Sequence, residues 1–141
     1  IAAFGITSVA GLLPHSLNQI KVAADITASS AIRDTILASI NQAEWTGASG
    51  QDLLSERFNL KRFAFDHMGQ QIESLTEQTP AYVAEVLVQP TTPQLHGSLD
   101  ESHLRRITFR VRPSASMDVP MDEDSAPGLQ SHSTILSRTG K

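Results

Sequence analysis

The chain has 141 residues and a mass of 15.3 kDa, a size typical of one small domain with terminal tails. Its formal net charge of −4 argues against a general nucleic-acid binder, and without cysteine it cannot form disulfides, use a catalytic thiol or bind metal through thiolates. Aromatic residues make up only 5% of the chain, so its core must be built mainly from Ala, Val, Ile and Leu. Because such a core buries little area per residue, we expect part of the chain to need a partner for its stability.

Residues 1–15 are predicted to form an apolar N-terminal arm, whose start at Ile1 rather than Met indicates a processed chain or a piece of a longer polypeptide. The apolar run is shorter than the ~20 residues that a membrane-spanning helix needs, and it lacks the basic region of a signal peptide. We therefore expect the arm to dock on the core or on another subunit, with membrane contact by residues 1–13 as the less favoured alternative. The candidate subunit-contact residues of the arm are Ile1, Phe4, Ile6, Leu12 and Leu13.

Residues 18–27 fit two patterns of secondary structure. Ile20 and Val22 belong to an alternation of apolar and polar residues that is typical of a half-buried strand. A helix can also be drawn, since Leu17, Ile20 and Ala24 would share one face, but its apolar stripe does not continue into the isoleucines that follow. We therefore predict a strand over 18–27 and keep the helix as the alternative.

The next segment has clear helical spacing, because Ile32, Ile36 and Ile40 recur four residues apart. Trp45 is expected to close one end of the core while its ring N–H finds a nearby acceptor. Beyond residue 49, apolar residues at helical spacing predict further helix as far as residue 77. We thus expect two or three helices within residues 30–78.

Two strands are predicted in the second half of the chain. Residues 81–89 contain a valine-rich apolar run, which is typical of a strand buried on both faces. In residues 104–112, Ile107, Phe109 and Val111 alternate with polar residues, so one face of this strand packs on a core and the other faces outward. We expect these two strands to pair antiparallel across the loop between them.

The second of these strands carries the one cluster of cations in the chain, namely Arg105, Arg106, Arg110 and Arg112. A guanidinium group is suited to bidentate hydrogen bonds with carboxylates and phosphates. Three interpretations remain open: a solvated or internally paired face, a contact with an acidic protein partner, and a contact with a nucleic-acid backbone. No aromatic residue shares the cationic face, so base stacking is not supported.

Residues 114–141 are predicted to form an extended tail that is acidic and rich in Ser and Pro. Its acidic residues begin only a few positions after the arginines, which keeps the two charge blocks at high effective concentration. We therefore expect the tail either to cover the arginines or to reach a neighbouring subunit. Ile135 and Leu136, its only adjacent apolar pair, are candidate subunit contacts.

Together these elements predict an α+β fold, with a small and mostly antiparallel sheet, two or three helices packed on it, and extended arms at both ends. The three expected strands are residues 18–27, 81–89 and 104–112. The expected organisation is an apolar arm over 1–15, a small domain over 16–113 and the acidic tail over 114–141.

The sequence contains no motif of a phosphate-binding loop, a serine hydrolase or a zinc protease. His96 and His103 flank Asp100 and Glu101, but this spacing matches no metal site and favours a solvated loop. We therefore predict no catalytic residue, no metal and no cofactor.

The expected function is that of a non-enzymatic structural or assembly component of a larger complex, which contacts other protein subunits in a homo- or hetero-oligomer. A virion (capsid) structural protein is one class that fits these features, and the virion would then be its location. The alternative function is a nucleic-acid backbone-binding module that uses the Arg-faced strand 104–112.

Overall fold

The computed structural model of the chain describes residues 2–90, 104–122 and 128–138, with side chains from residue 13 onward. The described part is an α+β fold that consists of two helices and one five-stranded antiparallel sheet, with the strand order β2-β1-β3-β4-β5. The helices are α1 (Ala2–Gln42) and α2 (Leu53–Phe58). The strands are β1 (Lys61–Phe65), β2 (Gln71–Ile72), β3 (Tyr82–Pro90), β4 (Leu104–Pro113) and β5 (Gln130–Ser137).

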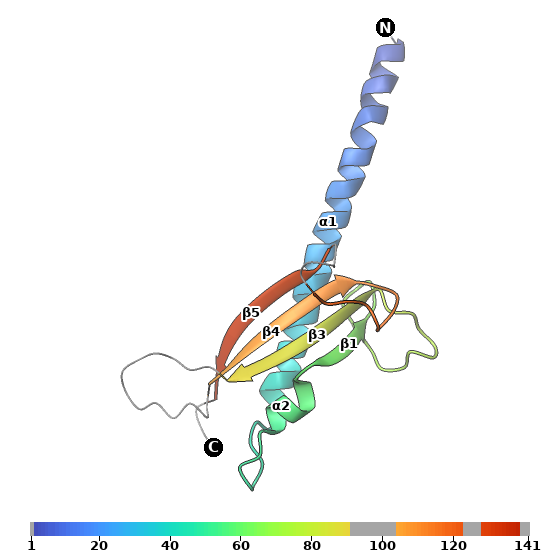
Figure 1. Cartoon of the computed structure of the whole chain (residues 1–141). Coiled ribbons are helices and arrows are strands. Elements are labelled where there is room, and N and C mark those ends of the chain that lie inside the picture. Colours follow the sequence, from blue (N-terminus) through green and yellow to red (C-terminus); the bar gives the residue numbers. More distant parts are fainter. Residues whose placement is uncertain (1, 91–103, 123–127, 139–141) are drawn as a thin grey trace, which may run out of the picture.

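The long helix α1 dominates the shape of the molecule (Figure 1). Its C-terminal half lies across one face of the sheet, while its N-terminal half projects beyond the sheet into solvent. The predicted strand over 18–27 is therefore wrong, because these residues continue the helix. The apolar stripe changes direction after residue 27 because each half of α1 presents a different face, and not because the helix breaks.

The docked half of α1 forms the core with the sheet, as its spacing predicts. Ile32, Ile36 and Ile40 are all buried, and they belong to one cluster with side chains of β3 and β4 such as Val86 and Phe109. A fully buried isoleucine contributes about 1.5–3 kcal/mol relative to an exposed one, so this stripe anchors the helix.

Trp45 belongs to the buried core just beyond the end of α1, and its ring N–H has an acceptor, as expected from the sequence. The indole Nε1 of Trp45 donates to the carbonyl oxygen of Ile40 at 3.4 Å, and the residue is buried. Arg138, which follows β5, donates from Nη1 to the carbonyl oxygen of Ala43 at 2.7 Å. The Ile40 carbonyl also accepts from the backbone N–H of Ala43 at 3.2 Å, so both side-chain bonds reinforce the chain where α1 ends.

The two strands predicted in the second half of the chain are confirmed. β3 and β4 pair antiparallel over nine residue pairs, from Tyr82↔Pro113 to Pro90↔Arg105. β3 lies at the centre of the sheet and is buried on both faces from Tyr82 to Val86. This position explains its nearly continuous apolar sequence.

The expectation of long helices beyond residue 49 is wrong. α2 has only six residues, and the chain then forms the hairpin of β1 and β2. Phe63 and Phe65 point to the same face of β1, toward the core, so a pattern with a period of two outweighs the helical spacing. The carboxylate of Asp66 shapes the turn by accepting hydrogen bonds from the backbone N–H groups of Met68 and Gln70, and these bonds lower the pKa of Asp66.

The prediction of an extended tail over 114–141 also needs correction. Gln130–Ser137 forms β5, which pairs antiparallel with β4 along eight residues and completes the sheet. The residue pattern of β5 is weak because the strand lies at the edge of the sheet and is mostly exposed. Pairing with β4, which is a tertiary interaction, therefore determines its conformation.

Candidate interaction surfaces

The arginines of β4 are divided between the two faces of the sheet. Arg106, Arg110 and Arg112 lie on the outer face, which is the face opposite α1, whereas Arg105 lies on the helix side. The side chain of Arg105 is only 13% exposed, and its Nη2 lies 3.4 Å from Oδ2 of Asp52 at the start of α2. Burial raises the pKa of Asp52, but the hydrogen bonds from Ser55 and the charge of Arg105 outweigh this effect, so the pKa lies below its ordinary value.

A buried carboxylate holds two arginines at the centre of the outer face. Cross-strand register places Arg62 of β1 and Arg110 of β4 on either side of Glu85 of β3. Oε1 of Glu85 lies 3.2 Å from Nε of Arg62, and Oε2 lies 3.6 Å from Nη1 of Arg110. The side chain of Glu85 is only 9% exposed, so solvent screens these pairs less than it screens surface ion pairs.

The segment 117–121, which follows β4, covers part of this face. Arg62 Nη1 donates to the carbonyl oxygens of Met117 and Val119 at 2.7 and 2.8 Å. Arg112 Nη1 donates to the carbonyl oxygen of Pro120 at 2.8 Å, and Met121 is buried. The first residues of the tail thus cover part of the arginines, as one of the two alternatives for the tail expected.

The covering segment binds the arginines through its main chain and not through its charges. Among the described contacts, neither Asp118 nor Asp122 bonds to an arginine. Arg105, Arg110 and Arg112 are all engaged within the chain, which leaves Arg106 as the exposed member of the predicted cluster. A polyanion would therefore meet fewer available cations than the sequence suggests.

The predicted subunit-contact residues differ in how far the fold buries them. The side chains of Ile1, Phe4, Ile6 and Leu12 lie outside the described residues, whereas Leu13 is 55% exposed. Strand alternation separates the pair in β5, because Leu136 packs against the core and Ile135 is 56% exposed on the outer face. Leu13 and Ile135 are thus available for a partner, while Leu136 is largely used by the fold.

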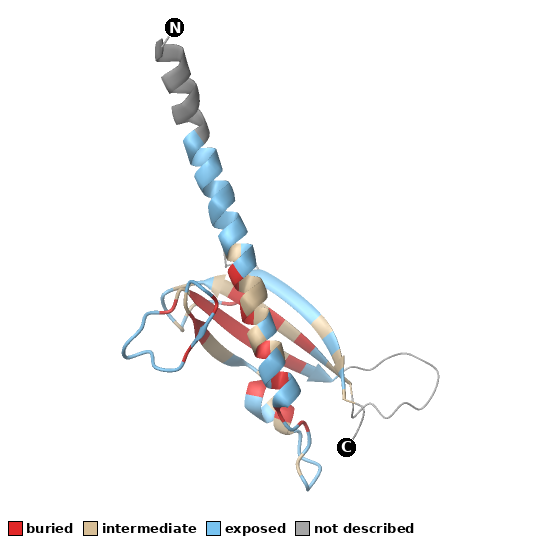
Figure 2. Ribbon diagram, turned by 180° about the vertical axis from the view of Figure 1, so that it is seen from behind, coloured by how far each residue is buried: buried red, intermediate tan, exposed pale blue. Residues whose placement is uncertain are grey.

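The projecting helix, which we define as residues 13–27 of α1, is almost entirely exposed (Figure 2), and among the described residues it carries more exposed large apolar side chains than any other element. Leu13, Leu17 and Ile20 follow one another at intervals of four and three residues, the spacing of a coiled-coil stripe. At 100° per residue, Val22 and Ile26 lie on roughly the opposite side of the helix. All five side chains are at least 55% exposed.

A hydrogen bond joins the base of the projecting helix to the sheet. Tyr82 donates from Oη to Oδ1 of Asp25 at 2.7 Å. Burial, together with the hydrogen bond to the Asp25 carboxylate and the charge of that carboxylate, raises the pKa of Tyr82 to about 12. This bond lies where α1 leaves the sheet, so it helps to set the direction of the projecting helix.

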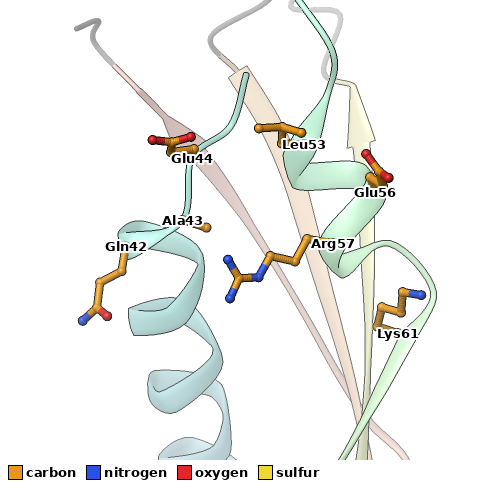
Figure 3. A pocket seen from close by; sticks show the side chains of 7 residues that line it. All are labelled: Gln42, Ala43, Glu44, Leu53, Glu56, Arg57 and Lys61. Carbon is orange, nitrogen blue, oxygen red and sulfur yellow. The ribbon is translucent and has the colours of Figure 1, made fainter. Parts of the chain in front are cut away.

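A depression of about 680 Å³ lies between the end of α1 and α2 (Figure 3). Its lining residues are Gln42, Ala43, Glu44, Leu53, Glu56, Arg57 and Lys61. In Figure 3, Arg57 extends into the space beside the end of α1, whereas Glu56 and Lys61 point away from that space. These charged side chains do not converge on one point, so the geometry favours no catalytic arrangement.

A second groove, of about 250 Å³, lies between α1 and the strands β4 and β5. Its apolar lining is Ile26, Phe109 and Val111, and its polar lining is Ser29, Ser30, Arg33, Gln130, Ser131 and His132. Within the described ranges, no group of three or more His, Asp or Glu residues could hold a metal ion. The predicted solvated loop from His96 to His103 lies outside the described residues.

The fold and its exposed surfaces thus define a small α+β domain with a projecting helix, a partly covered outer sheet face and an open groove beside the edge strand. In the part of the chain that the structure describes, no helix combines the length and apolar content needed to cross a membrane. No protein-family model, curated protein or solved structure matches the chain.

Proposed function

We propose that the protein is a non-enzymatic assembly subunit that binds neighbouring chains through its projecting helix. The observation that carries this proposal is the exposure of five large apolar side chains on residues 13–27: Leu13, Leu17, Ile20, Val22 and Ile26. Three of them, Leu13, Leu17 and Ile20, form one contiguous stripe, and contiguous apolar surface on a soluble protein usually marks a contact with a partner.

The energetics favour contact with several neighbours over contact with one. Full burial of a Leu or Ile side chain stabilises by about 1.5–3 kcal/mol, so burying the exposed part of each contributes about 1 kcal/mol. A pair of helices that joined two Leu13–Leu17–Ile20 stripes would bury six such side chains and gain about 6 kcal/mol. This is at the low end of the roughly 4–15 kcal/mol that association costs in lost freedom of motion, so one pair of helices would associate weakly.

The two-sided distribution of these side chains supports the same interpretation. The stripe of Leu13, Leu17 and Ile20 and the pair of Val22 and Ile26 face opposite directions, so a single partner helix cannot cover both. A helix with two apolar sides is suited to the interior of a bundle. A virion structural protein remains one prediction for the kind of assembly.

The alternative function, binding of a nucleic-acid backbone, gains no support from the contacts of the arginines. Arg110 is paired with Glu85, and Arg112 is bonded to the main chain of the covering segment. We therefore do not propose nucleic-acid binding as a second function.

The proposal is tested by sedimentation of the full chain over a range of concentrations, with Leu17→Asp as the disrupting variant. Ser16→Asp is the matched control, because it introduces the same charge at the preceding exposed position, between the two apolar sides of the helix. We expect the unaltered chain and the control to form concentration-dependent oligomers and Leu17→Asp to remain a monomer, with Trp45 fluorescence showing that all three are folded. A compact monomer at every concentration, or equal loss of association in both variants, would contradict the proposal.

A further inference from the structure

The outer edge of β5 is an unprotected strand edge. β5 is the last strand in the sheet order, and among the described residues no element pairs with its free side. Alternate residues of β5 therefore direct their N–H and C=O groups away from β4. Edge strands usually carry lysine, proline or a bulge that blocks further pairing, but Gln130–Ser137 contains no charged residue and no proline.

A groove with an apolar floor and a polar rim lies directly beside this edge. Ile26 of α1 and Phe109 and Val111 of β4 supply its apolar surface. Residues 130–132, at the start of β5, form its rim on the edge side. An edge strand next to a groove between the strand and a helix is the arrangement by which several peptide-binding domains add an extended segment to a sheet.

We propose that β5 accepts an extended segment of a partner polypeptide as a sixth strand, with one apolar side chain of that segment in the groove and one carboxylate beside Arg33. An added strand lies about 4.8 Å beyond β5, so its side chains on the helix side can reach back over the groove. Main-chain hydrogen bonds provide affinity in this mode, and the groove selects the side chain.

The charge of the groove selects an acidic segment. Arg33 is the one fully charged residue among those that line the groove, and no Asp or Glu is among them. The guanidinium already contacts Oδ1 of Asp34 at 3.2 Å and Oγ of Ser30 at 3.3 Å. Asp34 is 67% exposed, so this pair is weak, and Nη1 of Arg33 has no partner among the described contacts.

This contact shares Ile26 with the helix surface proposed above, but the two sites can be disrupted at different residues. Leu17 lies on the side of α1 opposite Ile26 and Arg33, so the helix stripe and the groove can be disrupted separately. Failure of helix-mediated assembly would leave strand addition at β5 untouched, and the reverse also holds.

The test uses the full chain and synthetic octapeptides in which Thr and Val alternate, with one central Leu and a C-terminal Glu or Lys. Binding is measured by calorimetry, and amide hydrogen exchange is measured by NMR. We expect the Glu peptide to bind about tenfold more tightly than the Lys peptide, and we expect Arg33→Gln to remove most of this preference. Lys21→Gln is the control, because it removes one positive charge at an exposed position of α1 outside the groove, and it should leave both affinities unchanged.

N-methylation of the peptide separates strand addition from other modes without altering the protein. Methyl groups on one alternate set of peptide nitrogens should abolish binding, and those on the other set should not, because only one set faces β5. Bound peptide should also slow exchange at alternate amides of β5. The proposal is overturned if no peptide binds, or if peptides methylated on either set of nitrogens bind equally well. It is also overturned if the amides at the β5 edge become protected with rising protein concentration alone, because a second copy of the chain would then occupy the edge.

Discussion

The hydroxyl of Tyr82 holds the base of the projecting helix on the sheet, and Tyr82→Phe removes it with little change of shape. A hydrogen bond to a charged group contributes about 1.5–3 kcal/mol in a protein. Tyr82 is 8% exposed, but its partner Asp25 is only half-buried and water competes for the carboxylate. We therefore expect the free energy of unfolding to fall by about 1–2 kcal/mol at neutral pH.

The same contact predicts how this contribution depends on pH. In the folded chain the pKa of Tyr82 is raised from 10.0 to about 12 by burial and by Asp25. The folded state therefore holds the phenolic proton more tightly than the unfolded state. The resulting stabilisation is complete below pH 10 and is lost as the pH rises from 10 to about 12. The difference in unfolding free energy between the unaltered chain and Tyr82→Phe should shrink over the same interval.

Two single residues make this measurement direct. The chain has one tyrosine and one tryptophan, so near-ultraviolet absorbance titrates Tyr82 alone and Trp45 fluorescence follows unfolding in urea. Asp25→Asn serves as a control, because it removes the carboxylate charge while keeping an acceptor. In this variant the pKa of Tyr82 should fall below about 12 but stay above its ordinary value of 10.0, because the burial remains. A pKa near 10 in the folded chain, or equal stability of Tyr82→Phe and the unaltered chain, would refute the reasoning.

Two further predictions concern packing, and urea unfolding checks both. Gly69→Ala should destabilise the fold by about 2–3 kcal/mol and Gly50→Ala by about 1 kcal/mol. Both glycines have a positive φ of nearly the same size, but only at Gly69 would an added Cβ lie 2.9 Å from Cβ of Ala31. If Gly69→Ala and Gly50→Ala lowered the unfolding free energy equally, the turn at Gly69 would be able to move away from α1 and relieve the contact with Ala31. Met121→Ala should destabilise by about 2 kcal/mol, because Met121 is buried, while Met68→Ala at a 67% exposed site should have almost no effect. A neutral result at Met121 would mean that residues 117–121 do not cover the sheet in solution.

Local patterns in the sequence were sufficient to predict the centre of the fold. The alternation of Ile107, Phe109 and Val111 and the apolar run of β3 predict the two central strands, because strand side chains alternate and a central strand is buried on both faces. The isoleucines of α1 predict a helix that packs on them. In each case the pattern is strong because the residues are buried, and burial restricts what each position can hold.

The tertiary structure decided the elements whose residues are mostly exposed. β5 becomes a strand because β4 offers an open edge, and residues 18–27 become helix because α1 extends cooperatively from its docked half. The arginine cluster follows the same rule. Alternation places Arg110 on the outer face, but only the register of β1, β3 and β4 brings Arg62 and Arg110 to Glu85. A single sequence shows which face a side chain occupies, whereas its neighbour across strands depends on pairing between segments that are far apart in the chain.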